Sequence, residues 1–319
     1  MTDAASRDDW SATRAWVEKH LGEGEWVEGA ERLRGGWTSE MRLLRVSGPG
    51  AGRRLVLRSF VEPFFRQHAE GLLTREAQVL SLLRSTDVPA ARCLAVDPTG
   101  EHGDHPSLLM SLLPGGVRLD EEEAERRAEL LARHLVRIHR VRVTERSRPR
   151  PYQAWTSPER VRVPRATDRP GLWARAVDVI RRDPPEYAGC FLHRDFHPGN
   201  VLFTGHGDDL RITGVVDWVE TSWGPADLDV AHCSTALALL HGPDAGLRFA
   251  DRYTAAGGRL AATPDDHLYW RLLDALAFAP DAEKVAVPWR ELGRTDLTAP
   301  VIAARLESYL EALFRCHGR

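Results

Sequence analysis

The chain has 319 residues, 43% of them hydrophobic, and a formal net charge of −3. This length suits about two domains with real hydrophobic cores, and the nearly balanced charge disfavours a duplex nucleic-acid binder, which carries a basic surplus. The four cysteines are scattered and form no C-x-x-C pair, so the pattern favours neither a zinc site nor a disulfide framework and fits a reducing compartment.

The chain begins with an acidic and polar stretch over residues 1–9. This stretch lacks the basic region and apolar run of a signal peptide. No later segment approaches the ~20 apolar residues that a membrane span requires. We therefore expect a cytoplasmic protein with no membrane association.

The first third of the chain has the pattern of a small sheet with one helix. Apolar residues alternate or cluster between turn residues, which predicts strands, and they recur at helical spacing in one longer segment. The predicted strands are two within 26–46, joined by a turn at 34–39, then 55–58 and 107–113, and the predicted helix is 70–84.

The remainder is predicted to be mainly helical. Asp120 is a plausible N-cap, followed by Glu121, Glu122 and Glu123 in the first turn of a helix that continues to His139. Residues 144–170 are rich in Arg and Pro and predict an irregular connection. Helices are predicted at 173–182, 225–240, 247–256, 265–277 and 299–316, with two short β-segments between 191 and 218.

The segment from Phe191 to Phe203 holds the clearest chemical pattern. Its apolar ends flank a polar loop with His193, Arg194, Asp195 and Asn200, the H-R-D-x-x-x-x-N pattern of a kinase catalytic loop. A second β-like run ends at Asp217. Mg²⁺ prefers carboxylate and other hard oxygen ligands, so Asp217 and Asn200 are candidate ligands, while Asp195 could orient an acceptor hydroxyl and take its proton.

A metal-dependent hydrolase is an alternative interpretation of the same loop. His193, Asp195 and His197 could ligate a transition metal, since imidazole and carboxylate are suitable donors. Arg194, however, replaces the glutamate that an H-E-x-x-H site requires, and Asn200 would be an unusual partner for zinc.

These motifs resemble the aminoglycoside phosphotransferase and choline-kinase-like family, whose fold is related to that of protein kinases. The resemblance rests on three segments: His193 to Leu202, Val215 to Trp218, and Gly224 to Ala231. It runs from about residue 25 to the end of the chain. It implies an α+β, protein-kinase-like two-lobe fold, with a nucleotide-binding lobe of antiparallel strands and one helix over 1–113. The resemblance further implies a hinge at about 110–115. A larger, mainly helical lobe over 114–319 would then carry the catalytic residues and bind the acceptor.

The resemblance also implies roles for single residues. Asp195 would be the catalytic base, and Asn200 and Asp217 would hold Mg²⁺. His193 belongs to the catalytic set but is expected to support the loop more than to act chemically. Asp229 would be a buried structural carboxylate that caps the helix after it.

The phosphate-covering loop of a kinase corresponds here to the turn that contains Gly36, Thr38 and Ser39. A kinase also uses a lysine on its third strand, paired with a glutamate on the next helix. Neither of the two lysines, Lys19 and Lys284, is placed for this role.

Arg58 stands at the position of that lysine, with Glu76 as its expected partner and Glu70 as the fallback. Arginine can hold phosphate oxygens bidentately, in a different geometry from lysine. Met110, Ser111 and Leu113 would contact adenine at the hinge, which favours ATP, although GTP is not excluded.

The sequence thus predicts a small-molecule kinase that transfers the γ-phosphoryl group of ATP, with Mg²⁺, to a hydroxyl group. A nucleotide-binding pseudokinase with little turnover is a second alternative, because Arg58 replaces the lysine. We expect a small-molecule acceptor and no nucleic-acid, membrane or obligate protein partner.

An acidic surplus in the last third of the chain would suit an amine-bearing, antibiotic-like acceptor. The identity of the acceptor and the role in resistance, biosynthesis or primary metabolism stay open. The acceptor site would draw on Trp155, Trp173, Trp223, Trp270, Asp274 and Trp289.

Overall fold

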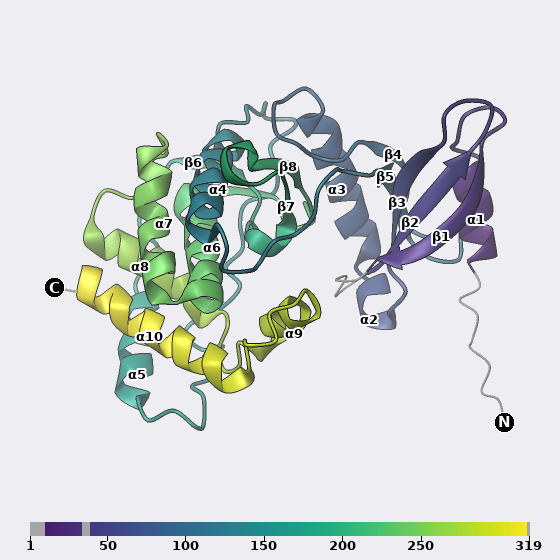
Figure 1. The fold of residues 1–319 in the computed structure, drawn as a ribbon. Coiled ribbons are helices and arrows are strands. Elements are labelled where there is room, and N and C mark those ends of the chain that lie inside the picture. The colour runs from purple at the N-terminus through teal and green to yellow at the C-terminus, as the bar shows by residue number, and fades with distance from the viewer. Residues whose placement is uncertain (1–9, 34–38, 318–319) are drawn as a thin grey trace, which may run out of the picture. The chain divides into compact units, whose positions relative to one another are not determined.

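The computed structural model describes residues 10–33 and 39–317. The chain divides into two compact units, one of residues 1–85 and 90–113 and the other of residues 86–89 and 114–319. Each unit has its own secondary-structure class, a sheet in the first and mostly helices in the second (Figure 1). The predicted α+β fold class is confirmed.

The first unit contains a five-stranded antiparallel sheet with the strand order β1-β2-β3-β5-β4. Leu44 and Val46 of β2 point into an apolar core, as the alternating sequence requires. The strands are β1 (Trp26–Leu33), β2 (Glu40–Ser47), β3 (Arg53–Ser59), β4 (Cys93–Asp97) and β5 (Ser107–Ser111).

Three helices belong to the described part of this unit, where the sequence predicted one. The predicted helix is α3 (Ala69–Leu83), and the two others are α1 (Ser11–Glu18) and α2 (Pro63–Arg66). Trp16 and Val17 of α1 complete the core of the sheet. α1, α2 and β4 were missed because each is too short to show a clear periodicity.

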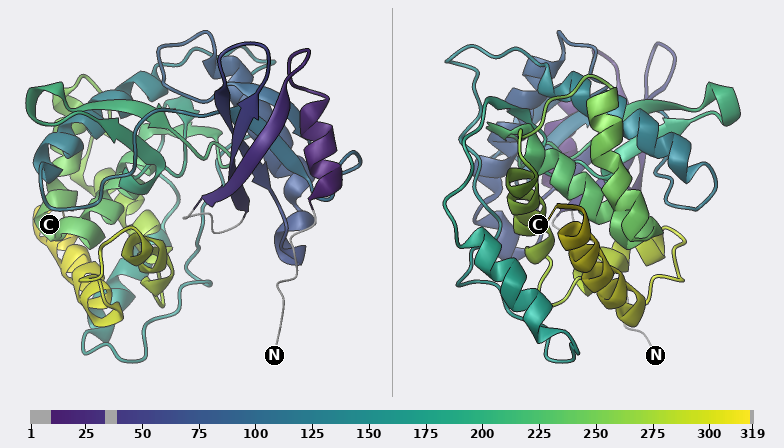
Figure 2. Two further views of the ribbon diagram at one scale, coloured as in Figure 1. Left: turned by 45° about the vertical axis from the view of Figure 1, so that its right-hand side comes forward. Right: turned by 90° about the vertical axis from the view of Figure 1, so that its left-hand side faces the viewer.

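The second unit is built around α6 (Ala226–His241), which is buried on nearly all sides. It packs against α4, α7, α8 and α10, and Figure 2 shows the yellow α10 beside the green helices. Its other helices are α4 (Ala124–His139), α5 (Pro170–Ile180), α7 (Pro243–Ala255), α8 (Pro264–Leu276), α9 (Glu283–Glu291) and α10 (Ala299–His317).

Two details of the helical unit differ from the prediction. α9 was missed because it contains Pro288, which normally argues against a helix interior. The start of α4 was also predicted wrongly: Glu123, in a left-handed conformation, precedes the helix, and Asp120 accepts a hydrogen bond from Arg127 at 3.2 Å instead of capping.

Two short antiparallel pairs carry the loops with the chemical pattern. β6 (Gly189–Leu192) pairs with β9 (Ser222–Pro225), and β7 (Val201–Thr204) pairs with β8 (Arg211–Val215). Since Leu192 lies opposite Ser222 and Val201 opposite Val215, residues 193–200 and 216–221 are two adjacent connections between the same pairs of strands. Among the helices of the described residues, none is both long and apolar enough to cross a membrane.

Candidate active site

The loop after β6 is held by the carboxylate of Asp229, which is fully buried on α6. Asp229 accepts hydrogen bonds from the backbone N–H groups of His193 and Arg194, both at 2.8 Å. Its Oδ2 also lies 3.2 Å from Nε2 of His139, whose Nδ1 lies 2.6 Å from the hydroxyl of Tyr253. Asp229 therefore positions the loop, and it does not cap the helix as predicted, because it lies inside α6.

His193 connects this loop to the second connection. Its Nδ1 accepts a hydrogen bond from the N–H of Asp195 at 3.2 Å, so the ring proton lies on Nε2, which donates to the carbonyl of Val216 at 3.0 Å. Complete burial of the ring lowers its pKa. With both nitrogens bonded to the backbone, His193 positions Asp195 and has no nitrogen left to act on a substrate.

Asp195 presents the most exposed carboxylate of this network, with 31% of its side chain accessible. Nδ2 of Asn200 donates to its Oδ2 at 3.0 Å and to its backbone carbonyl at 2.9 Å, and its Oδ1 lies 3.0 Å from Nε2 of His232. Burial by itself would raise the pKa of Asp195, but the hydrogen bond with His232 and the neighbouring histidines lower it well below its usual range. The carboxylate is therefore charged and fixed in orientation.

His232 was missed by the sequence analysis. It lies on α6 between two carboxylates, with Nε2 toward Asp195 and Nδ1 3.0 Å from Oδ1 of Asp274, whose Oδ2 accepts from Thr235 at 2.6 Å. Burial by itself would lower the pKa of His232, but the charge of Asp274 and the hydrogen bonds to both carboxylates raise it to about 10. The spacing gave one signal: His232 is three residues after Asp229 and so shares its helix face.

The two candidate magnesium ligands belong to neighbouring segments. The N–H of Val216, which precedes Asp217, donates to the carbonyl of Asn200 at 3.0 Å. Because the Asn200 amide donates both its bonds toward Asp195, its oxygen lies on the opposite side of the group. One carboxylate and one amide oxygen are ligands that suit Mg²⁺, so the residues fit this ion.

Backbone conformation distinguishes the same two segments. Of the three non-glycine residues with positive φ in the described parts of the chain, two are Arg194 at 73° and Asp217 at 66°. Such residues cost free energy and are held in place only by their surroundings. The hydrogen bonds to Asp229 hold Arg194 in this conformation, and the pairing of β7 with β8 fixes the backbone just before Asp217.

The structure argues against the transition-metal alternative. His193 is committed to the backbone on both sides, so the predicted set of His193, Asp195 and His197 is not available. Asp195, His197 and His232 do bring ligand atoms within 4.8 Å of one another. However, Nδ1 of His197 accepts a hydrogen bond from the N–H of Gly199 at 3.0 Å, which leaves the proton of the neutral ring on Nε2, the nitrogen that faces Asp195.

In the first unit, Arg58 and Glu76 form the expected pair. Nη1 of Arg58 donates to Oε2 of Glu76 at 2.6 Å, and both side chains are buried. Nε of Arg58 donates to the hydroxyl of Ser39 at 3.0 Å. β3 and α3 thus present a guanidinium where a kinase presents an ammonium, and Ser39 is tied to it. Gly36 and Thr38 lie outside the described residues.

The predicted adenine contacts are at the end of β5. Met110 is buried and pairs with Val56 of β3. The N–H of Ser111 donates to the carbonyl of Arg92 at 2.9 Å, so this group is already used by the unit's own structure. Within the described residues, the backbone groups of Leu113 have no hydrogen-bond partner, which leaves them available to a ligand.

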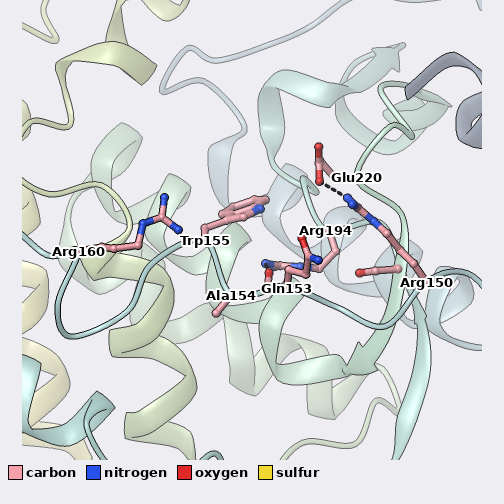
Figure 3. A pocket seen from close by; sticks show the side chains of 8 residues that line it. Arg150, Gln153, Ala154, Trp155, Arg160, Arg194 and Glu220 are labelled. Atoms are coloured by element: carbon pink, nitrogen blue, oxygen red, sulfur yellow. Dashed lines mark hydrogen bonds and ion pairs between the residues drawn. The ribbon is translucent and has the colours of Figure 1, made fainter. Parts of the chain in front are cut away.

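Of the residues considered for the acceptor site, Trp155 lines a cavity of the second unit (Figure 3). Trp173, Trp270 and Trp289 are buried in the helical core. Asp274 is buried against His232, and Trp223 lies under the guanidinium of Arg148, 5.0 Å from the ring centroid.

Comparison with known proteins identifies the family. The model of the phosphotransferase enzyme family matches residues 29–273, well over half of the chain. The chain belongs to this family. It is a phosphotransferase that acts on hydroxyl groups. No curated protein sequence matches the chain.

Solved aminoglycoside phosphotransferases share its protein-kinase-like fold. A provisionally assigned one from Ralstonia eutropha JMP134 is 19% identical, covers 96% of this chain and 98% of its own, and has a TM-score of 0.61. APH(4)-Ia is also 19% identical, with coverages of 96% and 98% and a TM-score of 0.59. The aminoglycoside-3'-phosphotransferase of type VIII is 20% identical, with coverages of 83% and 98% and a TM-score of 0.55. At these identities the likeness establishes the fold alone.

Substituting Asp229→Asn tests the positioning of the phosphotransferase loop. An amide keeps the shape but offers one acceptor to two N–H groups, so we expect the free energy of unfolding to fall by about 3 kcal/mol, together with most of the activity. Urea denaturation measures the loss, and Asp251→Asn on the exposed side of α7 is the control. Equal stability of the two variants would contradict the role of Asp229.

Substituting His232→Gln tests the charge on this ring. A pKa raised from 6.5 to about 10 means that the charged ring stabilises the fold fully below pH 6.5 and loses this effect as the pH rises through 10. We expect the variant to be less stable than the parent by about 3 kcal/mol at pH 6, with a gap that narrows toward pH 10. Denaturation at several pH values measures it, with the exposed His206→Gln as control. A gap that does not depend on pH would show that the ring is neutral.

Proposed function

We propose that the protein is a small-molecule kinase that transfers the γ-phosphoryl group of ATP, with Mg²⁺, to a hydroxyl group of its acceptor. The observation that carries the proposal is the convergence of Asp195, Asn200 and Asp217 on two adjacent connections. Phosphoryl transfer is catalysed mainly by positioning and charge stabilisation, and this arrangement supplies a fixed carboxylate beside two oxygen ligands.

Asp195 is proposed to orient the acceptor hydroxyl. Its oxygens accept bonds from Asn200 and His232, but each carboxylate oxygen has two lone pairs, so both can accept a further hydrogen bond. Its lowered pKa makes it a weak base. Such a group aligns the hydroxyl early and takes the proton only as the bond to phosphorus forms, which suits a loose transition state.

Asn200 and Asp217 are proposed to hold Mg²⁺ through the amide oxygen and the carboxylate. When bound, the ion would neutralise charge on the phosphate oxygens. The chain's own contribution is to hold the two oxygen ligands on adjacent segments, joined by the hydrogen bond from Val216 to Asn200.

Arg58 is proposed to bind the nucleotide phosphates from its ion pair with Glu76. Related structures support a nucleotide substrate: a mutant of APH(4)-Ia was solved with AMP-PNP and hygromycin B, and APH(2")-IIia with GDP and kanamycin. Both ATP and GTP are therefore candidate donors, and ATP is the first to test. Retention of all three oxygen-bearing side chains favours turnover over a pseudokinase.

Substituting Asp195→Ala is expected to reduce kcat by at least about a hundredfold, because the acceptor hydroxyl loses its orienting group. Nucleotide affinity should stay nearly normal, since Asn200 and Asp217 remain. The release of ADP from Mg·ATP in the presence of a panel of hydroxyl compounds measures kcat, and calorimetry measures nucleotide affinity. Asp209→Ala, at an exposed turn between β7 and β8, is the matched control. Near-normal kcat in the Asp195 variant would refute the assignment.

Substituting Asp217→Ala is expected to raise the Mg²⁺ concentration for half-maximal nucleotide binding by at least about tenfold. The cause is the loss of the carboxylate ligand. A Mg²⁺ titration at fixed ATP measures the change. An unchanged titration would remove Asp217 from the metal site.

A further inference from the structure

A cavity of about 210 Å³ lies beside the catalytic loop, within the second unit (Figure 3). Its charged lining consists of Arg150, Arg160, Arg194 and Glu220. Nη2 of Arg150 donates to Oε2 of Glu220 at 2.7 Å, so this carboxylate is already paired. Arg160 and Arg194 therefore give the cavity a surplus of positive charge.

Arg194 is a buried cation with an incomplete set of partners. Only 3% of the residue is exposed. Its Nη2 donates to the carbonyl of Gln153 at 3.2 Å, and its guanidinium lies 4.3 Å from the ring centroid of Trp155. Its Nη1 is buried and has no hydrogen-bond partner in the described part of the chain. An unpaired donor on a buried charge is costly, so this nitrogen favours a ligand that accepts a hydrogen bond.

Ser222 contributes a second unused polar group to the same cavity. It is the first residue of β9, only 2% exposed, and it also lines the cavity. Its hydroxyl has no hydrogen-bond partner among the residues that the structure describes. A guanidinium N–H and a hydroxyl, together with Arg160, form a set of donors that matches the oxygens of a carboxylate or phosphate.

The cavity is next to the proposed catalytic carboxylate. Arg194 directly precedes Asp195 in the loop. Trp155 packs edge-on against His232 with ring centroids 4.8 Å apart, and His232 bonds to Asp195. Figure 3 shows the lining side chains of Arg194 and Trp155 in the middle of the view, with Arg160 on one side and the pair of Arg150 and Glu220 on the other. A molecule in this cavity would therefore contact the residue before Asp195 and the ring that packs against His232.

We propose that this cavity binds an anionic oxygen group of the acceptor, so that the substrate is a hydroxylated carboxylate or phosphate ester rather than an amine. The inference rests on the proposed kinase function and specifies its substrate class. It reverses the expectation of an amine-bearing acceptor, because an ammonium group here would face two arginines that form no salt bridge in the described part of the chain. That expectation came from the summed charge of the C-terminal third, which does not report the charge at one cavity.

Compounds that differ only in one terminal group test the proposal. One set is D-gluconate, D-glucitol 1-phosphate, D-glucitol and 1-amino-1-deoxy-D-glucitol, which differ at C1. The other is 4-(hydroxymethyl)benzoate, 1,4-benzenedimethanol and 4-(aminomethyl)benzyl alcohol, which offer a ring to Trp155. In calorimetry with the full-length protein, we expect an anionic member of at least one set to bind at least about tenfold more tightly than its neutral and cationic counterparts. Gluconate against the phosphate ester distinguishes a carboxylate site from a phosphate site.

Variants connect this binding to the cavity. Arg194→Gln and Arg160→Gln are each expected to weaken it by about tenfold or more, while Arg165→Gln, an exposed arginine outside the cavity, leaves it unchanged. Arg160 is exposed, so its variant keeps the test valid if the Arg194 variant fails to fold. Preference for the amines, or no binding by any anionic member, overturns the proposal, as does binding that neither cavity variant weakens.

Turnover separates this inference from the kinase proposal. If both hold, Asp195→Ala still binds the anionic compound but no longer phosphorylates it. Arginine-dependent binding without nucleotide-dependent transfer by the parent protein would overturn the kinase proposal and support an anion site. Phosphorylation that favours the amines would support the kinase and overturn the anion site.

Discussion

One buried carboxylate, that of Asp229, fixes the loop on which the proposed chemistry depends. It accepts hydrogen bonds from the N–H groups of His193 and Arg194. These bonds hold Arg194 at a φ of 73°, a conformation that residues other than glycine seldom adopt. The strained turn directs Asp195 toward His232 of α6 and Arg194 toward Trp155. Because His193 then bonds to Val216, the position of Asp217 depends on the same carboxylate.

Charge in this region follows a consistent design. His232 is shared between Asp195 and Asp274, both of them carboxylates, so its positive charge is stabilised in spite of its burial. This pairing keeps Asp195 ionised and weakly basic. Arg194, the residue before Asp195, places positive charge on the cavity side of the loop. The loop thus presents two groups of opposite charge. The carboxylate of Asp195 can accept a hydrogen bond from a hydroxyl, and the guanidinium of Arg194 can bind an anion. One acceptor molecule could contact both groups.

The sequence was sufficient to predict the features that depend on residues close together along the chain or on the order of neighbouring elements. Asp195, Asn200 and Asp217 lie within motifs whose flanking apolar runs define the strands, so their convergence could be predicted. The pair of Arg58 and Glu76 followed from the order of strand and helix, although 18 residues separate them. Short or proline-containing elements such as α1, β4 and α9 carry too weak a periodicity to be recognised.

Features that depend on tertiary packing could not be predicted in the same way. His232 meets Asp195 only because α6 lies against the loop, and Trp155 joins them from an irregular segment that no periodicity describes. Arg194 is the arginine of the H-R-D pattern, to which the sequence analysis assigned no binding role. The capping role expected of Asp229 failed for a related reason, because its partners are 35 and 36 residues earlier in the chain.

The most direct test of the kinase account is a crystal structure of the protein with Mg²⁺ and a non-hydrolysable ATP analogue. The account predicts an ion coordinated by the carboxylate of Asp217 and the amide oxygen of Asn200, and a carboxylate of Asp195 that is not a ligand and faces the terminal phosphate. An ion held instead by Asp195, His197 and His232, with no nucleotide phosphate on it, would contradict it.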